Sequence, residues 1–242
     1  MSKLQKEKGI IVRSFKYGES SLILDILTSQ HGLKSFIIQS VRKAKSKTSP
    51  SSIQLAASVD IDFYLKENAD LYQLKEIKVN TIWNSLYSDI RKITMCMFLT
   101  ELTRKVLNKY ENHDEEYIIL FNILKDLENH DDNWSLHIWY LLQLQQIQGI
   151  SILRHPIESG NYFDIVLQQM GNNIPQHHLY FNRDELNMLS KIESLDLRQV
   201  SSLHITRTEK NTILNKLLEY LKTQIPSIQD INSLDVLKSV FD

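Results

Sequence analysis

Apolar and polar positions alternate with a period of two over the first third of the chain, which is the pattern of β-strands. The clearest stretch is VDIDFYLK (59–66), in which every second residue is apolar. Four further apolar runs lie at 9–18, 21–29, 33–41 and 71–79, separated by short connections such as YGES, QHG and ENAD. Five short strands joined by tight turns bury their apolar faces by curling into a small barrel, and these proportions predict an OB-fold.

The pattern changes to a helical period at about residue 81. Apolar residues then recur with the i, i+3, i+4, i+7 spacing of amphipathic helices. The stretches that show this spacing lie at 90–106, 117–127, 134–142 and 214–221. The last predicted helix has capping residues at 206–208 and ends before Pro226.

These patterns together predict an α+β protein with two domains, an N-terminal OB-fold barrel followed by a mostly α-helical domain. We place the OB-fold, as a nucleic-acid-binding domain, at residues 1–79 and the helical domain at residues 80–242. Residues 149–181 contain three of the six glycines and two of the four prolines. We therefore expect an irregular insert at this place in the helical domain.

Positive charge is concentrated at the front of the chain, although the formal net charge is only −1. Residues 1–79 hold 13 Lys and Arg against 8 Asp and Glu, and residues 80–242 hold 15 against 21. Four cations follow the third predicted strand within six positions: Arg42, Lys43, Lys45 and Lys47. A basic front and an acidic back favour contact of the front with a polyanion.

Cations on a loop beside an OB-fold neutralise phosphates, and strand aromatics provide stacking surfaces for bases. The candidate aromatics are Phe15, Tyr17, Phe36, Tyr64 and Tyr72. Phe36 lies off the face that carries Leu33 and Ile37, which favours its exposure. The alternative is that the loop is only a solvated connection and that the aromatics belong to the core.

The remaining candidate chemistry is sparse. The sequence has no P-loop, GxSxG, HExxH or GxGxxG motif, so we expect a protein that is not an enzyme. The single cysteine, Cys96, lies among Met and Phe residues and is expected to be a buried apolar residue. His155, His177 and His178 surround Asp164 in the irregular segment, but their spacing is poor for a metal site, and exposed loop histidines are the preferred interpretation.

The helical part carries cations beside apolar stripes, namely Arg91, Lys92, Arg104 and Lys105. A groove with an apolar floor and a cationic rim suits an acidic, hydrophobic peptide tail. The alternative is that these are ordinary surface charges on amphipathic helices.

The order of these features resembles the RecO family of bacterial recombination mediators over nearly the whole chain. The resemblance starts with KGIIVRSFKYGESSLILDILTSQHGLKSFIIQSVRKAKSK, an apolar strand, an Arg, a Tyr-x-Glu turn and a strand that runs into a basic loop. It continues through VDIDFYLKENADLYQLKEIKV and the helical FLTELTRKVL. The ordered combination, rather than any one motif, carries the resemblance.

Membership in this family would imply an N-terminal OB-fold, a helical C-terminal domain and a role in DNA repair and homologous recombination. It would further imply binding of single- and double-stranded DNA, annealing of complementary strands, and contact with the C-terminal tail of the single-strand binding protein SSB. With RecR, and in some settings RecF, such proteins help RecA replace SSB on gapped DNA, and they consume no cofactor. By position, the implied DNA contacts are Arg42, Lys43, Lys45 and Lys47, with Arg13 and Lys34 as secondary candidates.

The sequence departs from the family at one place. Many members carry a four-cysteine zinc site in the region that corresponds to 151–181, and this chain has no cysteine there. We therefore expect no metal, and a segment held together by packing. The residues expected to provide that packing are Tyr162, Phe163, Ile165 and residues 179–181.

The start of the chain, MSKLQKEKG, has no apolar signal region, and no apolar run approaches the length of about 20 residues that crosses a bilayer. With a single cysteine, these features favour a cytoplasmic, nucleoid-associated protein without membrane contact. The competing hypothesis is a non-catalytic OB-fold module whose basic loop binds an acidic protein or RNA.

Overall fold

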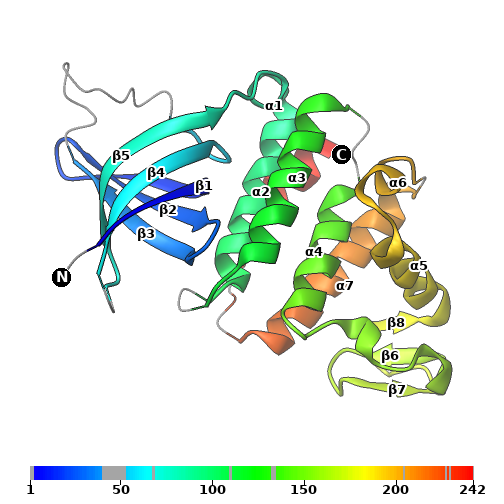
Figure 1. Ribbon diagram of the computed structural model, residues 1–242. Helices are drawn as coiled ribbons and strands as arrows, with labels where there is room; N and C mark the ends of the chain where they lie inside the picture. Colours follow the sequence, from blue (N-terminus) through cyan, green and yellow to red (C-terminus); the bar gives the residue numbers. More distant parts are fainter. Residues whose placement is uncertain are drawn as a thin grey trace. The chain divides into compact units, whose positions relative to one another are not determined.

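The computed structural model of the protein describes residues 3–39, 53–66, 69–108, 111–131, 135–203, 205–226, 228 and 230–241. The chain forms two compact units, the first of residues 1–129 with 233–240 and the second of residues 130–232 with 241–242. The long blue and cyan strands in Figure 1 belong to the first unit, and the small yellow-green sheet belongs to the second.

Five strands of the first unit close into a barrel in the order β1-β2-β3-β5-β4. They are β1 (Lys3–Tyr17), β2 (Ser21–Thr28), β3 (Gly32–Ile38), β4 (Ser58–Leu65) and β5 (Tyr72–Thr81). All pairings are antiparallel except β3 with β5, which run parallel. This five-stranded barrel followed by helices confirms the predicted fold class.

β1 is long because it pairs with two neighbouring strands, β4 and β2. Its first half pairs with β4 and its second half with β2, and the two registers overlap at Gly9 and Ile10. A Cβ atom at Gly9 would lie 2.4 Å from the Ile26 side chain, so only glycine allows the strands to approach so closely there. The register with β2 then shifts between Ile11 and Arg13. Such a bulge bends a strand, and residues 13–17 beyond it are exposed on both faces.

Aromatic rings fill the middle of the barrel. Phe36 and Phe63 pack edge to face with their ring centroids 5.1 Å apart, and Tyr72 contacts both rings. Around them lie the apolar residues that alternate along β2 and β4, as the two-residue period predicts.

Four helices complete the first unit: α1 (Ser85–Ser88), α2 (Ile90–Val106), α3 (Asp114–Asn129) and α8 (Ser233–Phe241). Both α2 and α3 contact β1. The indole N–H of Trp83 donates to the carbonyl oxygen of Ala56 at 3.0 Å, which ties the chain after the barrel to the chain before β4. The barrel itself ends at Thr81, and the compact unit that contains it also includes residues of these helices.

The second unit is built around α4 (Leu136–Ile147), whose residues are mostly buried. Three helices pack against it: α5 (Arg183–Ser194), α6 (Leu197–Ser201) and α7 (Arg207–Gln224). α7 begins at the predicted cap, because the Thr206 hydroxyl accepts a hydrogen bond from the Glu209 backbone and the Glu209 carboxylate binds back to the Thr206 N–H.

Between α4 and α5 lie two short 3₁₀ helices, η2 (Ile152–Arg154) and η3 (Ile157–Ser159), and a three-stranded sheet in the order β7-β6-β8. The strands are β6 (Tyr162–Asp164), β7 (Gln169–Gly171) and β8 (Tyr180–Asn182). The segment 149–181 is thus more regular than predicted, because strands of three residues are too short to show an alternating pattern.

Packing holds this small sheet in place, as the sequence predicts. Phe163 and Phe181 lie opposite each other in register and are both completely buried. The Phe163 ring lies 5.7 Å from that of Tyr220 on α7, and Ile165 is also buried.

Candidate nucleic-acid interface

The exposed end of β1 alternates basic and aromatic side chains. Arg13, Phe15 and Tyr17 share one face of the strand, and Lys16 lies on the opposite face. Phe15 is 37% exposed and Tyr17 is 54% exposed. We call these four residues the hairpin cluster. Cations beside exposed rings are the combination with which OB-folds hold single strands, through phosphate neutralisation and base stacking.

The position of Arg13 is set by its neighbours. Its guanidinium lies 4.5 Å from the centre of the Phe15 ring and 3.6 Å from the Asp25 carboxylate. Asp25 is itself buried and accepts a 2.6 Å hydrogen bond from the Ser35 hydroxyl. The Arg13 side chain is still 48% exposed, so a fixed guanidinium lies over an aromatic ring with part of its surface free for a ligand.

The four loop cations, Arg42, Lys43, Lys45 and Lys47, lie outside the described residues. The described part of β3 does show where the chain enters that segment. Ile38, the last residue of β3, pairs with Leu22 of β2, and Leu22 pairs with Lys16 on its other side. The described end of β3 therefore lies two strands away from the hairpin cluster, at the same end of the sheet.

Lys34 lies elsewhere. It pairs in register with Ile26, a core residue, so it belongs to the inward-facing set of β3, near the turn between β2 and β3. It is half-buried, and this burial lowers the pKa of Lys34 below its usual value. The structure therefore does not bring Lys34 and Arg13 together on one surface.

The expected stacking residues divide into two groups. Phe36 and Tyr72 are 0% and 7% exposed, so the expectation that Phe36 is exposed is wrong. The reason is its register: Phe36 lies opposite Leu24, which faces the core. Tyr64 is 39% exposed but pairs with Leu4 at the other end of β1, away from the hairpin cluster.

Sequence reasoning missed Lys16, although the stretch FKYG at the end of β1 shows a cation between two aromatic residues. The sequence pattern gives no sign of the bulge between Ile11 and Arg13. A regular strand in a closed barrel exposes only one face, whereas both faces of β1 are exposed beyond this bulge.

Most of the helical cations make contacts within the first unit. Lys92 is only 4% exposed, and its ammonium donates to the Ser85 hydroxyl at 2.6 Å inside the first unit. Arg91 pairs with Asp89 at 2.8 Å, and Lys105 pairs with Glu101 at 3.3 Å. Three of the four expected cations are thus occupied by contacts within the unit.

The histidines of the small sheet serve structural contacts. His177 Nε2 lies 3.3 Å from the Asp164 carboxylate, and the His155 ring packs against Phe163 with centroids 4.9 Å apart. His178 is exposed. Among the residues that the structure describes, no three His, Cys, Asp or Glu side chains come together as a metal site would require.

Cys96 is buried, as predicted, and its burial raises the pKa of the thiol well above the usual range. The thiol stays protonated and is a poor nucleophile in the folded protein. Within the described part of the chain, no helix has the length and apolar character needed to cross a membrane.

Comparison with known families covers both parts of the chain. The family model described as "Recombination protein O N terminal" matches residues 1–83, and the model described as "Recombination protein O C terminal" matches residues 87–230. The first match spans the whole barrel, and the second spans α2, α3 and most of the second unit.

Full-length relatives show the same similarity. The DNA repair protein RecO of Phocaeicola vulgatus is 24% identical over 239 residues, which are 98% of this chain and 99% of the relative. The proteins of the same name from Flavobacterium psychrophilum and Flavobacterium johnsoniae are 27% and 28% identical, and each alignment covers 98% of both chains.

Proposed function

Because the chain belongs to the RecO family of DNA repair proteins, with a role in DNA repair and recombination, we propose that it acts as a non-catalytic mediator that binds DNA through the hairpin end of its barrel. In this proposal it binds single- and double-stranded DNA and anneals complementary strands. With RecR, and RecF where it is present, it helps to load RecA onto DNA covered by SSB.

The observation that supports the proposal is that exposed aromatic rings and cations, the two kinds of side chain that hold single strands, lie together at one end of the barrel. Phe15 and Tyr17 offer exposed rings, and Arg13 and Lys16 offer cations beside them. The chain then enters the segment of Arg42, Lys43, Lys45 and Lys47 at the same end. Stacking on aromatic rings tolerates every base, which suits a protein that must act on any gapped sequence.

In this proposal, neutralisation of phosphates by cations promotes the annealing step. Two complementary strands repel each other through their phosphates, and cations that neutralise those phosphates reduce this repulsion. In this proposal, the cations at the end of β1 and those of the segment after β3 contact the phosphates of two strands. Chemistry on the DNA is not required of the protein, since base pairing itself makes the product stable.

Fluorescence anisotropy with a labelled oligothymidine tests the proposal. We expect replacement of Arg42, Lys43, Lys45 and Lys47 by Ala to weaken binding on the order of 100-fold at physiological salt and to reduce the salt slope by roughly 3. The matched control replaces four exposed cations elsewhere, Lys125, Lys191, Arg198 and Arg207, and should leave both values near those of the unchanged protein.

Equal losses in the two variants would show that binding follows total charge rather than this end of the barrel. Binding to an acidic SSB-tail peptide without binding to any oligonucleotide would favour the protein-interaction module instead. Strand annealing of complementary oligonucleotides, with and without SSB, extends the same comparison to the proposed activity.

A further inference from the structure

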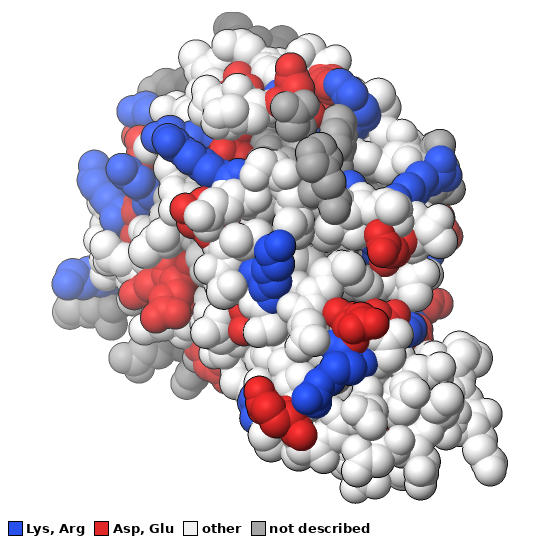
Figure 2. Space-filling model, turned by 90° about the vertical axis from the view of Figure 1, so that its right-hand side faces the viewer, with Lys and Arg blue, Asp and Glu red and all other residues white. Residues whose placement is uncertain are grey.

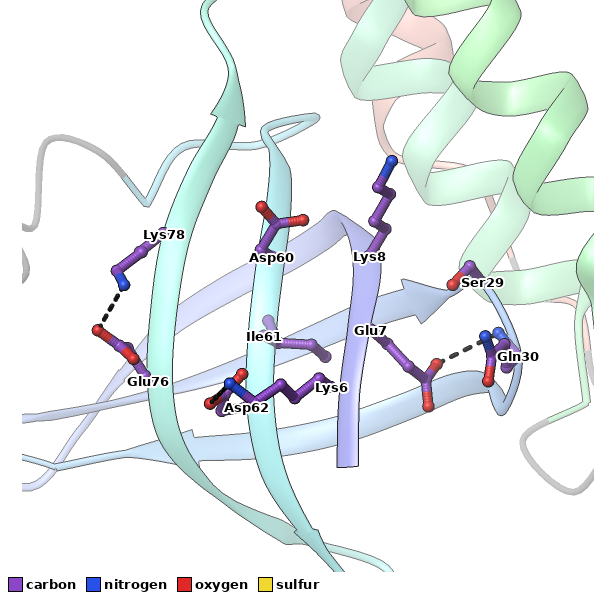
Figure 3. A pocket seen from close by; sticks show the side chains of 10 residues that line it. All are labelled: Lys6, Glu7, Lys8, Ser29, Gln30, Asp60, Ile61, Asp62, Glu76 and Lys78. Carbon is purple, nitrogen blue, oxygen red and sulfur yellow. Dashed lines mark hydrogen bonds and ion pairs between the residues drawn. The ribbon is translucent and has the colours of Figure 1, made fainter. Parts of the chain in front are cut away.

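The barrel places its carboxylates in two different ways. Figure 3 shows a pocket of about 540 Å³ on β1, β4 and β5, where carboxylates lie beside cations at the surface. There Asp62 lies 3.2 Å from Lys6, and Glu76 lies 2.9 Å from Lys78. At the hairpin end, by contrast, the side chain of Asp25 is only 5% exposed. A buried carboxylate is costly to desolvate and repels phosphates, so its place beside a proposed DNA contact needs a physical reason.

Asp25 is the middle residue of a row that crosses three strands. Arg13 of β1 pairs in register with Asp25 of β2, which pairs in register with Ser35 of β3. Residues directly opposite each other on neighbouring strands share one face of the sheet, so the three side chains lie side by side. The Ser35 hydroxyl donates to Asp25 at 2.6 Å, and the Arg13 guanidinium lies 3.6 Å from the other carboxylate oxygen. The row thus leads from two buried side chains to one exposed guanidinium.

The next row on the same face is apolar. Phe15 pairs in register with Ile23, and Ile23 pairs with Ile37. Phe15 is 37% exposed, and the two isoleucines are half-buried. The Arg13 guanidinium lies 4.5 Å from the centre of the Phe15 ring, at the edge of this row. An unpaired base can stack on such a surface, whereas the bases of a duplex are already stacked on one another, so the surface suits an unpaired nucleotide.

The contact between Asp25 and Arg13 has two opposite effects on DNA binding. An arginine on an exposed strand has many rotamers, and fixing it when a ligand binds costs conformational entropy. Because Asp25 restricts the guanidinium before DNA arrives, less entropy is lost on binding. The same contact offsets part of the positive charge of Arg13, which weakens its attraction to any phosphate. The sign of the effect on affinity therefore shows which of the two dominates.

We propose that Asp25 and Ser35 are positioning residues for single-strand binding, which hold the Arg13 guanidinium beside the Phe15 ring where it contacts an unpaired nucleotide. For single strands, the fixed position of the guanidinium outweighs the loss of positive charge. A duplex offers no unpaired base to this surface and gains nothing from the fixed position. The inference rests on the proposed DNA-binding function of the hairpin cluster and assigns this contact to single strands.

The test compares two variants of the full chain that each lose one negative charge at the hairpin end. Asp25→Asn keeps the shape of the side chain and an oxygen that accepts from Ser35. We expect its affinity for labelled oligothymidine, measured by fluorescence anisotropy, to fall about threefold, and its affinity for a duplex to change less than about twofold. Glu19→Gln removes the same charge from the exposed turn between β1 and β2, and should leave oligothymidine affinity unchanged or raise it by up to about twofold.

Three further variants separate positioning from a structural role. In an Arg13→Ala background, Asp25→Asn should change oligothymidine affinity less than about 1.5-fold, because the group that it positions is gone. Ser35→Ala removes the hydroxyl donor and should weaken oligothymidine binding about twofold. Arg13→Lys keeps the charge but loses the planar group, and should weaken oligothymidine binding about threefold with little effect on a duplex. Because it alters only an exposed side chain, Arg13→Lys tests the proposal even if Asp25→Asn lowers the melting temperature of the barrel.

Four outcomes would overturn the proposal. They are an oligothymidine affinity of Asp25→Asn equal to or above that of the unchanged protein, equal losses for single strands and duplexes, the same Asp25→Asn effect with and without Arg13, and full affinity of Arg13→Lys. If the unchanged protein does not bind oligothymidine, the proposed function itself fails. If it binds and one of these four results is found, only the positioning role of Asp25 and Ser35 fails.

Discussion

The barrel of the first unit and the small sheet of the second unit differ in the charge that they carry. The first unit exposes it: cations and aromatics alternate on the hairpin cluster, and both signs line the pocket on β1, β4 and β5. The sheet of the second unit nearly lacks it. Between residues 160 and 182 the only charged side chain is Asp164, which pairs with His177. Figure 2 shows an area without blue or red at its lower right, at the level of β6 and β7 in Figure 1. DNA contact through phosphates is therefore expected of the first unit and not of this sheet.

Two buried histidines repeat the contrast inside the units. In the first unit, burial by itself lowers the pKa of His113, but the Glu116 carboxylate and the Asn108 carbonyl outweigh burial, so the pKa is raised. In the second unit, burial lowers the pKa of His137 to about 3, and Lys210 adds to the effect. Partners thus favour the charged form of His113, whereas burial without such partners favours the neutral form of His137.

The largest expected effect separates the units by stability. Phe163→Ala removes a completely buried ring that packs on Phe181 and Tyr220, and we expect a loss of about 3–5 kcal/mol in unfolding free energy. Urea denaturation measures the loss, and oligothymidine affinity of the folded variant should change less than about twofold. The control, Val166→Ala, changes an exposed residue of the same segment and should cost less than about 0.5 kcal/mol. A large fall in DNA affinity with Phe163→Ala would break the separation of roles.

The next effect concerns pH. Because the folded pKa of His137 is depressed, its contribution to stability is present above the unfolded value of about 6.5 and is lost as pH falls towards 3, by up to about 1.4 kcal/mol per pH unit. Because the folded pKa of His113 is raised, its contribution is present below about 6.5 and is lost as pH rises through the folded pKa.

Melting temperatures at several pH values test both signs. His137→Gln should flatten the acid side of the stability profile, and His113→Gln should flatten the alkaline side. If His113→Gln changed only the acid side, the assignment of an internal cation to the first unit would be wrong.

A smaller effect tests the stacking surface. Replacing Phe15 and Tyr17 together by Leu keeps an apolar side chain but removes the rings, and we expect single-strand affinity to fall about tenfold with little change in salt slope. Tyr64→Leu changes a ring of similar exposure away from the hairpin cluster and serves as the control. A loss that appears mainly in the salt slope would mean that the rings only position Arg13.

The smallest effect separates the two secondary candidates within the barrel. Arg13→Ala removes an exposed guanidinium beside Phe15, and we expect DNA affinity to fall about threefold to fivefold. Lys34→Ala removes a half-buried ammonium from the inward-facing set of β3 and should change affinity less than about twofold. A larger effect for Lys34 would place the DNA at the turn between β2 and β3.

Local patterns in the sequence determine much of this architecture. The alternation in 59–66 specifies which residues of β4 face the core, and the apolar spacing of 117–127 specifies α3. The Thr206–Glu209 cap marks the start of α7. These features follow from interactions between residues near each other in the chain, so a reader of the sequence can find them.

Only the tertiary structure decides which side chains meet. Phe36 and Lys92 look like exposed ligands in the sequence, yet barrel closure buries the first, and contacts between α1, α2 and α3 bury the second. The bulge in β1 exposes Lys16, and cross-strand register sets Lys8 beside Asp60. Register and closure depend on residues far apart in the chain, and a shift of one position reverses every face of a strand, so composition and period can specify the elements but not the surfaces they form.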